Sequence, residues 1–246
     1  MNSLLMNFSG VFADEGWDAV IASQPGSSTL DLSGIEGARR YCDTDAQTAI
    51  TQAIAPHPLK AVHWIDTGDY HYLTALWLRR LTDPVDLLLL DNHPDDQAPA
   101  FGGDNGLLSC GSWMLEARAN PLVRRTLTLG VGGSPYASVT KQALNVAECP
   151  QNTPAATKTP EIVADIPLYI SIDLDVLGPD YFRANWNQGT MSLDGLFAIL
   201  DTATKNRPIA GIDICGGLPS SEGATPEDLS LNLRTRTALL KYCAEL

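Results

Sequence analysis

Short apolar runs alternate with amphipathic segments along the chain, which is typical of βαβ units around a mostly parallel sheet. Several runs are apolar at every position, as strands covered by helices on both faces are. The predicted strands are 18–21, 60–66, 85–91, 126–131, 168–175 and 209–215, and the predicted helices are 71–81, 112–119, 193–205 and 226–244. The pattern predicts an α/β fold of three layers, αβα, with a central and mostly parallel sheet.

The last predicted helix has the clearest start signal. Thr225 can cap it, Pro226 suits its first turn, and two acidic residues that follow favour the positive end of the helix dipole. Segment 149–160 is predicted to be a surface loop, and residues with candidate chemistry lie on both sides of it. We therefore expect residues 1–246 to form a single domain.

Composition narrows the classes of partner. The net charge of -13 argues against a nucleic-acid partner, because phosphates require clustered Lys and Arg. No apolar stretch approaches the roughly 20 residues that span a bilayer, and the first residues lack a signal-peptide pattern, so no membrane association is expected. The 5 cysteines are scattered and include no CxxC pair, which favours a reducing, cytoplasmic location. A homo-oligomer is compatible with the sequence, which does not define the oligomeric state.

One apolar run, LLLL, leads directly into the charged residues DNHPDD. Strand residues alternate between faces, so Asp91, His93 and Asp95 are predicted to point the same way from the end of one strand. In parallel α/β sheets, ligands bind beyond the carboxyl ends of the strands, which is where this cluster falls. Taken alone, the cluster fits a metal site and a solvated loop equally well.

A second cluster lies in the segment SIDLD, where Ser171, Asp173 and Asp175 share one face of another apolar run. An ionised aspartate inside such a run costs several kcal/mol unless it is paired or bound to a metal. Two carboxylates at this spacing also repel each other without a cation between them. The two clusters together predict a divalent metal site, and His71, which follows a turn at Gly68, is a third candidate ligand. Sites dominated by oxygen ligands with one or two imidazoles suit Mn²⁺.

Together, GDYH, DNHPD and SIDLD resemble the metal-binding segments of the arginase and agmatinase (ureohydrolase) family. The resemblance implies an α/β fold with two Mn²⁺ ions at the strand ends. It implies that the metal ligands are His71, Asp91, His93, Asp95, Asp173 and Asp175, with Asp91 and Asp173 bridging the two ions. It also implies a catalytic role for Asp95, which would hold the attacking hydroxide by a hydrogen bond.

The departures from the family pattern lie around the substrate. Tyr70 separates Asp69 from His71, where the family usually has Gly-Gly-Asp-His, and Cys110 stands where the family commonly has a proton-shuttling histidine. Gly216 stands at the position of the glutamate that binds the guanidinium group. Glu222 and Asp213 are candidates to replace that glutamate.

The residues that grip a free amino acid's carboxylate in the family are also absent here. Asp96 and Gln97 occupy those positions, and we predict that they contact the substrate together with Asn187 and Gln188 in the segment ANWNQG. The compact chain and the SCGSW and ANWNQG segments resemble peptide arginases, which convert arginine side chains of peptides to ornithine.

The predicted function is therefore hydrolysis of a guanidino group by a two-manganese site, with peptidyl arginine as the preferred substrate and urea as a product. Alternatives are a free small guanidino compound, amide hydrolysis at one zinc ion, and a metal-stabilised binding protein without catalysis. The chain's 4 histidines count against the zinc alternative, which relies on paired histidines near the metal.

Overall fold

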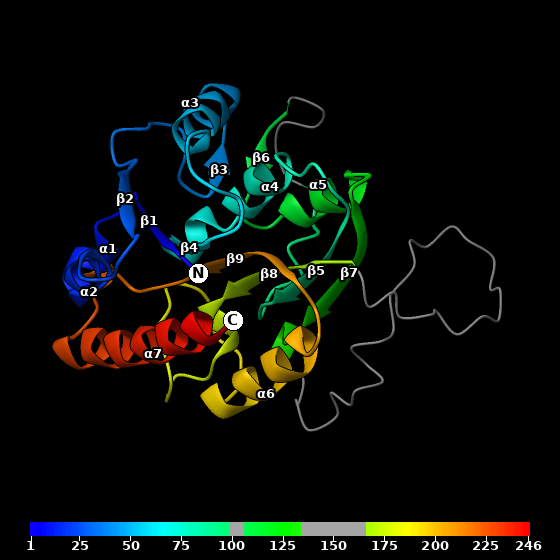
Figure 1. Cartoon of the computed structure of the whole chain (residues 1–246). Coiled ribbons are helices and arrows are strands. Elements are labelled where there is room, and N and C mark those ends of the chain that lie inside the picture. The colour runs from blue at the N-terminus through cyan, green and yellow to red at the C-terminus, as the bar shows by residue number, and fades with distance from the viewer. Residues whose placement is uncertain (99–105, 134–165) are drawn as a thin grey trace.

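The computed structural model describes residues 1–98, 106–133 and 166–246. A seven-stranded sheet, in which every pair of neighbouring strands is parallel, runs through the middle of the molecule in the order β2-β1-β4-β9-β8-β5-β7 (Figure 1). Its strands are β1 (Ser3–Asn7), β2 (Ser28–Asp31), β4 (Val62–Ile65), β5 (Val85–Leu90), β7 (Val123–Leu129), β8 (Leu168–Asp173) and β9 (Ile209–Cys215). A short antiparallel pair, β3 (Tyr41–Cys42) and β6 (Leu108–Ser109), forms a second sheet.

Helices cover both faces of the large sheet (Figure 1). One apolar cluster joins it to α3 (Thr44–Ile54), α4 (Leu73–Leu78) and α5 (Trp113–Ala119). A second cluster joins it to α1 (Val11–Glu15), α2 (Trp17–Ala22), α6 (Leu193–Thr204) and α7 (Pro226–Glu245). The leucines of β5 serve both clusters alternately, since Leu87 and Leu89 belong to the first and Leu88 and Leu90 to the second. The predicted three-layer αβα architecture is confirmed.

Most predicted strands are present, with shifted ends. The prediction of a strand at 18–21 is wrong, because these residues lie in α2, where Trp17 and Ile21 are buried one helical turn apart. Strand β7 begins at Val123 rather than at residue 126. Its first residues include two arginines, and Arg125 pairs with Asp86 on the neighbouring strand. A search for apolar residues alone therefore places the beginning of this strand too late.

The four predicted helices correspond to α4, α5, α6 and α7, and the predicted start of α7 is confirmed. Thr225 accepts a hydrogen bond from the Asp228 N–H, and the Asp228 side chain accepts one from the Thr225 N–H. The buried strand β1, the mostly exposed strand β2 and helix α3 were not predicted. The predicted loop at 149–160 lies outside the described residues, and the single domain stays a prediction.

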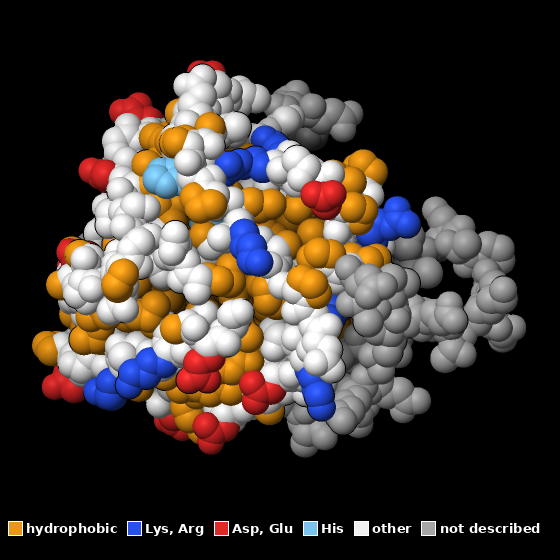
Figure 2. All heavy atoms as spheres, viewed as in Figure 1, with side chains coloured by type: hydrophobic (Ala, Val, Ile, Leu, Met, Phe, Trp, Pro, Cys, Tyr) orange, Lys and Arg blue, Asp and Glu red, His pale blue; other side chains and the backbone are white. Residues whose placement is uncertain are grey.

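The face of the molecule drawn in Figure 2 carries no large basic area. On the face shown in Figure 2, Lys and Arg side chains are scattered among acidic and apolar ones and form no continuous stripe. Within the described residues, no helix combines the length and apolar character needed to cross a membrane.

Candidate metal centre

The candidate ligands lie where three neighbouring strands end. Strands β5, β8 and β9 are adjacent in the sheet, and the register pairs Asp173 at the end of β8 with Cys215 at the end of β9. Asp91 follows the last residue of β5, Leu90, which pairs with Ile172 of β8. Because parallel strands present their carboxyl ends at one edge, Asp91 and Asp173 lie together at that edge, as predicted.

The residues after each strand converge through turns and not through strand alternation. Strand β5 stops before Asp91, and Asp175 lies in the 3-10 helix η5 (Leu174–Val176) that follows β8. In both segments the aspartate accepts the backbone N–H two residues on. Asp91 Oδ1 lies 2.6 Å from the His93 nitrogen, and Asp173 Oδ1 lies 2.9 Å from the Asp175 nitrogen. The prediction that alternation along a strand aligns these side chains is therefore only partly right, because the turns after the strands bring them together.

This turn fixes one oxygen of each carboxylate and directs the other toward the site. Asp175 is held in a related way, since its Oδ1 accepts the Asn92 N–H at 3.1 Å. The second oxygens of Asp91 and Asp175 are buried and have no hydrogen-bond donor among the described residues. Each of these aspartates therefore offers one carboxylate oxygen to a bound cation.

His71 reaches the same site from β4. The chain leaves β4 through the 3-10 helix η1 (Gly68–Tyr70), and a side chain at Gly68 would place its Cβ 2.8 Å from Trp186 and 2.9 Å from the Asp173 carboxylate. Only glycine allows this close approach. His71 Nε2 lies 2.9 Å from the Ser171 hydroxyl, so the imidazole is held with Nδ1 facing the carboxylates.

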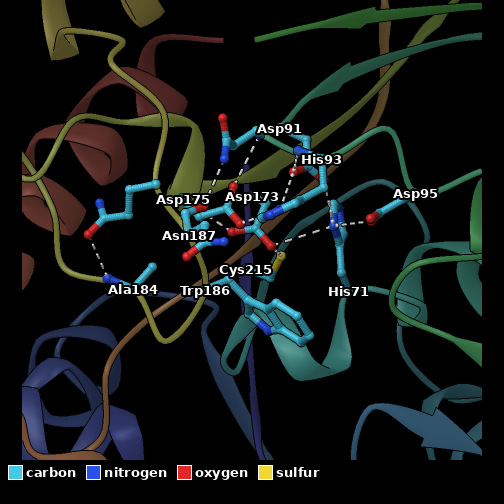
Figure 3. Close-up of polar contacts among 12 residues, drawn as sticks. His71, Asp91, His93, Asp95, Asp173, Asp175, Ala184, Trp186, Asn187 and Cys215 are labelled. Carbon is cyan, nitrogen blue, oxygen red and sulfur yellow. Dashed lines mark hydrogen bonds and ion pairs between the residues drawn. The ribbon is translucent and has the colours of Figure 1, made fainter. Parts of the chain in front are cut away.

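Two clusters of ligand atoms share Asp91 (Figure 3). In the first cluster, His71 Nδ1 lies 3.1 Å from Asp91 Oδ2 and 3.0 Å from Asp95 Oδ2. In the second cluster, His93 Nδ1 lies 2.8 Å from Asp175 Oδ2 and 3.5 Å from Asp91 Oδ1. The arrangement matches two neighbouring metal positions bridged by Asp91.

Asp173 lies beside the first cluster, with its Oδ2 atom 3.6 Å from His71 Nδ1. It also forms a third group of potential ligands with His71 and Cys215. The six predicted metal ligands are thus assembled at one point of the described structure. The second bridging role, predicted for Asp173, stays a prediction.

The electrostatics of the clusters fit a bound cation. Burial raises the pKa of Asp173 to about 7, and the nearby charges of Asp175 and Asp91 add to the rise. Burial likewise raises the pKa of Asp175 to about 6. His71 Nδ1 is buried and has no hydrogen-bond partner, although it faces three carboxylates. Crowded carboxylates with unpaired oxygens are what divalent metal ions stabilise.

Asp95 is positioned by a strained backbone and one buried donor. Its φ of 48° lies in the left-handed region, which aspartate visits more readily than most residues. The Trp113 indole N–H donates to Asp95 Oδ2 at 2.6 Å, and the Asp95 carbonyl accepts the Met114 N–H. Both contacts come from α5, so this helix fixes the carboxylate that was predicted to be catalytic.

Cys215 is a member of the site that the sequence analysis did not select. Its buried thiol lies 3.2 Å from Asp173 Oδ2, and burial raises its pKa well above the ordinary range, so the thiol donates to the carboxylate. The signal available in the sequence was its place at the end of the strand IDIC, beside the strand that ends in Asp173.

A cavity of about 470 Å³ opens over the metal ligands, which is a size typical of small-molecule sites. It is lined by Arg40, Tyr41, Gly68, Asp91, His93, Pro94, Asp95, Gln97, Ala98, Ser109, Cys110, Gly111, Asp173, Asp175 and Trp186. Trp186 belongs to the segment ANWNQG, in which the sequence analysis selected the two following residues and missed the aromatic one. Its ring stands edge-on to His93, with centroids 6.0 Å apart (Figure 3).

The four predicted substrate contacts are placed differently from one another. Gln97 lines the cavity, whereas Asp96 pairs with Arg118 at 2.8 Å and is not among the lining residues. Asn187 is exposed, and its backbone carbonyl accepts a hydrogen bond from the Asn92 side-chain amide at 2.9 Å.

The Gln188 amide is used inside its own loop. It donates to the carbonyls of Leu177 and Phe182 at 3.0 and 2.9 Å and accepts the Ala184 N–H at 3.3 Å. This arrangement gives Gln188 the role of holding the loop that carries Trp186, and its substrate contact remains only a prediction.

The candidates for the absent glutamate lie outside the cavity lining. Asp213 is bonded to His63 at 2.7 Å and to the Tyr169 hydroxyl at 2.9 Å, and Glu222 pairs with Arg39. Cys110 does line the cavity, and burial raises the pKa of its thiol to about 12, so it is not an activated nucleophile.

Comparisons with known proteins bear on the fold. No protein-family model matches the sequence. An uncharacterized protein of Thermotoga maritima is 28% identical over 182 residues, which span 74% of this chain and 68% of that protein.

Solved structures give stronger likeness in three dimensions. Formimidoylglutamase from Bacillus subtilis superposes with a TM-score of 0.63 at 14% identity, covering 97% of this chain and 85% of the other. Entamoeba histolytica arginase, solved with L-ornithine, gives 0.62 at 11% identity and covers 95% and 96%. A triple mutant of a T. brucei arginase-like protein, bound with Mn²⁺, gives 0.61 at 15% identity and covers 98% and 88%. The chain has the fold of the arginases and agmatinases.

Proposed function

We propose that this protein is a hydrolase that uses two metal ions to cleave a guanidino group and release urea. One observation carries the proposal: the ligand clusters that share Asp91 leave buried carboxylate oxygens unpaired at the sheet edge. The arginase fold supports the same reaction class, because a formimidoylglutamase, an arginase and a hypothetical agmatinase share it.

The donor set supports Mn²⁺ as the metal. Asp91 would be shared, His71 and Asp95 would complete one position, and His93 and Asp175 the other. Each position has a single imidazole and is otherwise formed by oxygen atoms, which is the donor set that Mn²⁺ accepts readily. When bound, such a pair of ions lowers the pKa of a water molecule and orients it toward the substrate carbon.

The protein's own groups have defined tasks in this reaction. Water adds to the guanidinium carbon, the bond from that carbon to the nitrogen that bears the rest of the substrate breaks, and that nitrogen takes up the proton that the water gave up. The products are urea and a protonated primary amine. The Asp95 carboxylate would accept a proton from the attacking water through the oxygen that a metal ion leaves free, while the Trp113 N–H donates to Oδ2 and keeps the carboxylate in position. The buried apolar strands below the site limit access of bulk water to one side.

The preferred substrate is an arginine residue within a peptide, which would be converted to ornithine as a post-translational modification. The argument is that the residues which grip a free amino acid's carboxylate in the family are replaced here by Asp96, which is engaged by Arg118, and by Gln97, which lines the cavity. A free small guanidino compound is the second candidate, favoured by the limited cavity of about 470 Å³. A cytoplasmic location and a homo-oligomer stay predictions.

Metal analysis followed by product analysis tests the proposal. The protein purified with Mn²⁺ should contain two manganese ions per chain and should release urea from an arginine-containing peptide, with loss of one CH₂N₂ unit by mass spectrometry. One zinc ion per chain with amidase activity would support the deacetylase-like alternative. Metal binding without release of urea from peptidyl arginine, arginine or agmatine would refute the proposed hydrolase activity and would favour a metal-stabilised binding protein.

A further inference from the structure

Arg40 gives the cavity a single cationic group. Among the described residues that line the cavity, Arg40 is the only Lys or Arg, whereas four are aspartates of the metal centre. The cavity therefore has a metal-binding end and, apart from it, one guanidinium group. The proposed reaction assigns no task to this group.

The backbone of Arg40 is strained and fixed on both sides. Its φ of 62° lies in the left-handed region, which is costly for a residue with a long side chain. Its N–H donates to the Asp69 carbonyl at 3.1 Å, and its carbonyl accepts the Cys110 N–H at 3.0 Å. Strain of this kind persists where the surroundings enforce it, and it is concentrated at functional sites.

The Arg40 side chain is anchored by one nitrogen only. Nε donates to Asp69 Oδ1 at 3.1 Å, and neither Nη atom has a hydrogen bond to the described part of the protein. The neighbouring Arg39 differs, because its Nε binds Asp69 and its Nη2 binds Glu222. Arg40 thus keeps two N–H-bearing nitrogens available to a planar anion, in the geometry that suits a carboxylate.

Trp186 connects this group to the metal centre. The Arg40 guanidinium carbon lies 5.2 Å from the centre of the Trp186 ring, and the same indole lies against His93. The Trp186 N–H also donates to Asp69 Oδ1 at 2.9 Å, so Asp69 orients both the indole and the arginine. A substrate a few bonds long can therefore contact Arg40 at one end and the metal centre at the other.

We infer that Arg40 is a specificity-determining residue that binds a carboxylate of the substrate, at the end remote from the guanidino group. This inference rests on the proposed function. The carboxylate belongs either to a free small guanidino acid or to the C-terminus of a peptide that ends in arginine. A peptide that ends in arginine belongs to the preferred substrate class, and a free guanidino acid belongs to the second. In both cases the uncharged amide is a poorer substrate than the acid.

The test uses the manganese-loaded protein and two matched pairs of substrates. One pair is 4-guanidinobutanoate and 4-guanidinobutanamide, and the other is acetyl-alanyl-arginine with a free or an amidated C-terminus. The ratio of kcat/KM between acid and amide should be about 10- to 100-fold in at least one pair, as expected for a charge-assisted hydrogen bond. The pair that shows the ratio identifies the source of the carboxylate.

Variants separate recognition from general damage. Arg40→Gln should reduce the ratio toward one, and Arg40→Lys should keep part of it, because the ratio is internal to each variant. Arg39→Gln removes the same charge one residue away, outside the cavity lining, and should keep the wild-type ratio. Urea release with equal rates for acids and amides, or a ratio unchanged in Arg40→Gln, overturns the inference and leaves the proposed function standing. No urea from any of the four substrates refutes the proposed function for these substrates, and the inference falls with it.

Discussion

The metal-free protein should lose stability as the pH rises from about 5 to about 8. Burial, with the charges of Asp175 and Asp91, raises the pKa of Asp173 from 3.8 to about 7. Between these two pKa values the folded chain holds a proton that the unfolded chain has released. The stability contributed by protonated Asp173 is therefore fully present below the unfolded pKa and is lost as the pH rises through about 7. The Asp175 carboxylate, 2.8 Å from the His93 ring, raises the pKa of His93 to about 11, and this adds a loss of stability in the same direction above about pH 6.5.

The magnitude follows from these pKa values. Each pH unit over which the folded chain binds one extra proton is worth about 1.4 kcal/mol, so the loss from Asp173 alone between about pH 5 and about pH 7 is roughly 3 kcal/mol. For a chain of this length, that corresponds to a fall in Tm of roughly 5–10 °C. Metal ions reverse the trend, because their binding requires deprotonated ligands and therefore stabilises the fold more at higher pH.

Scanning calorimetry across this pH range, on protein stripped with a chelator and on protein reloaded with Mn²⁺, measures both trends. Asp173→Asn should be more stable than the wild type without metal at about pH 8, should show a shallower pH dependence and should bind less metal. Asp180→Asn, at an exposed position, is the matched control and should behave as the wild type. The reasoning fails if the stripped wild type gains stability as pH rises, or if Asp173→Asn keeps the full slope.

Three further changes test separate parts of the site. Asp91→Asn should lower the manganese content from two ions to below one per chain by elemental analysis, because this residue belongs to both clusters, whereas Asp96→Asn should keep both ions. Trp113→Phe removes the donor to Asp95 Oδ2 and should lower kcat about tenfold with the metal retained, as measured by urea release; an unchanged kcat would show that Asp95 needs no such support. Gly216→Glu, which restores the family residue, should destabilise the protein by about 1–3 kcal/mol in urea titrations, because Gly216 has a φ of 110° and its added Cβ would lie 3.0 Å from Leu174. Recovery of activity at wild-type stability would contradict that last expectation.

The sequence was most informative where local pattern and burial agree. The run of leucines in β5 and the apolar residues of β8 and β9 predicted central strands correctly, because a strand buried on both faces has few alternatives. The segment 18–21 misled because a short apolar run does not distinguish a strand from one side of a helix. Strand β2 escaped prediction since its residues STLD are mostly exposed and lie at the edge of the sheet.

The residues of the candidate site also differ in how clearly the sequence marks them. The candidate metal ligands could be selected from the sequence because ionisable residues at the ends of apolar runs are costly without a cation, whatever turn they adopt. Residues facing the substrate gave no comparable signal. Arg40 and Trp186 line the cavity but come from distant segments, and they are brought together only by contacts that the fold creates.

A physical difference separates the candidate metal ligands from the residues that line the rest of the cavity. Each ligand turn is local: an aspartate accepts the N–H two residues on, so the motif carries its own geometry, as at Asp91 and Asp173. The substrate side depends on Asp69, which binds two arginines and Trp186 from separate segments. The candidate metal ligands are therefore held by local turns, whereas the position of Arg40 depends on contacts between segments that lie far apart in the sequence.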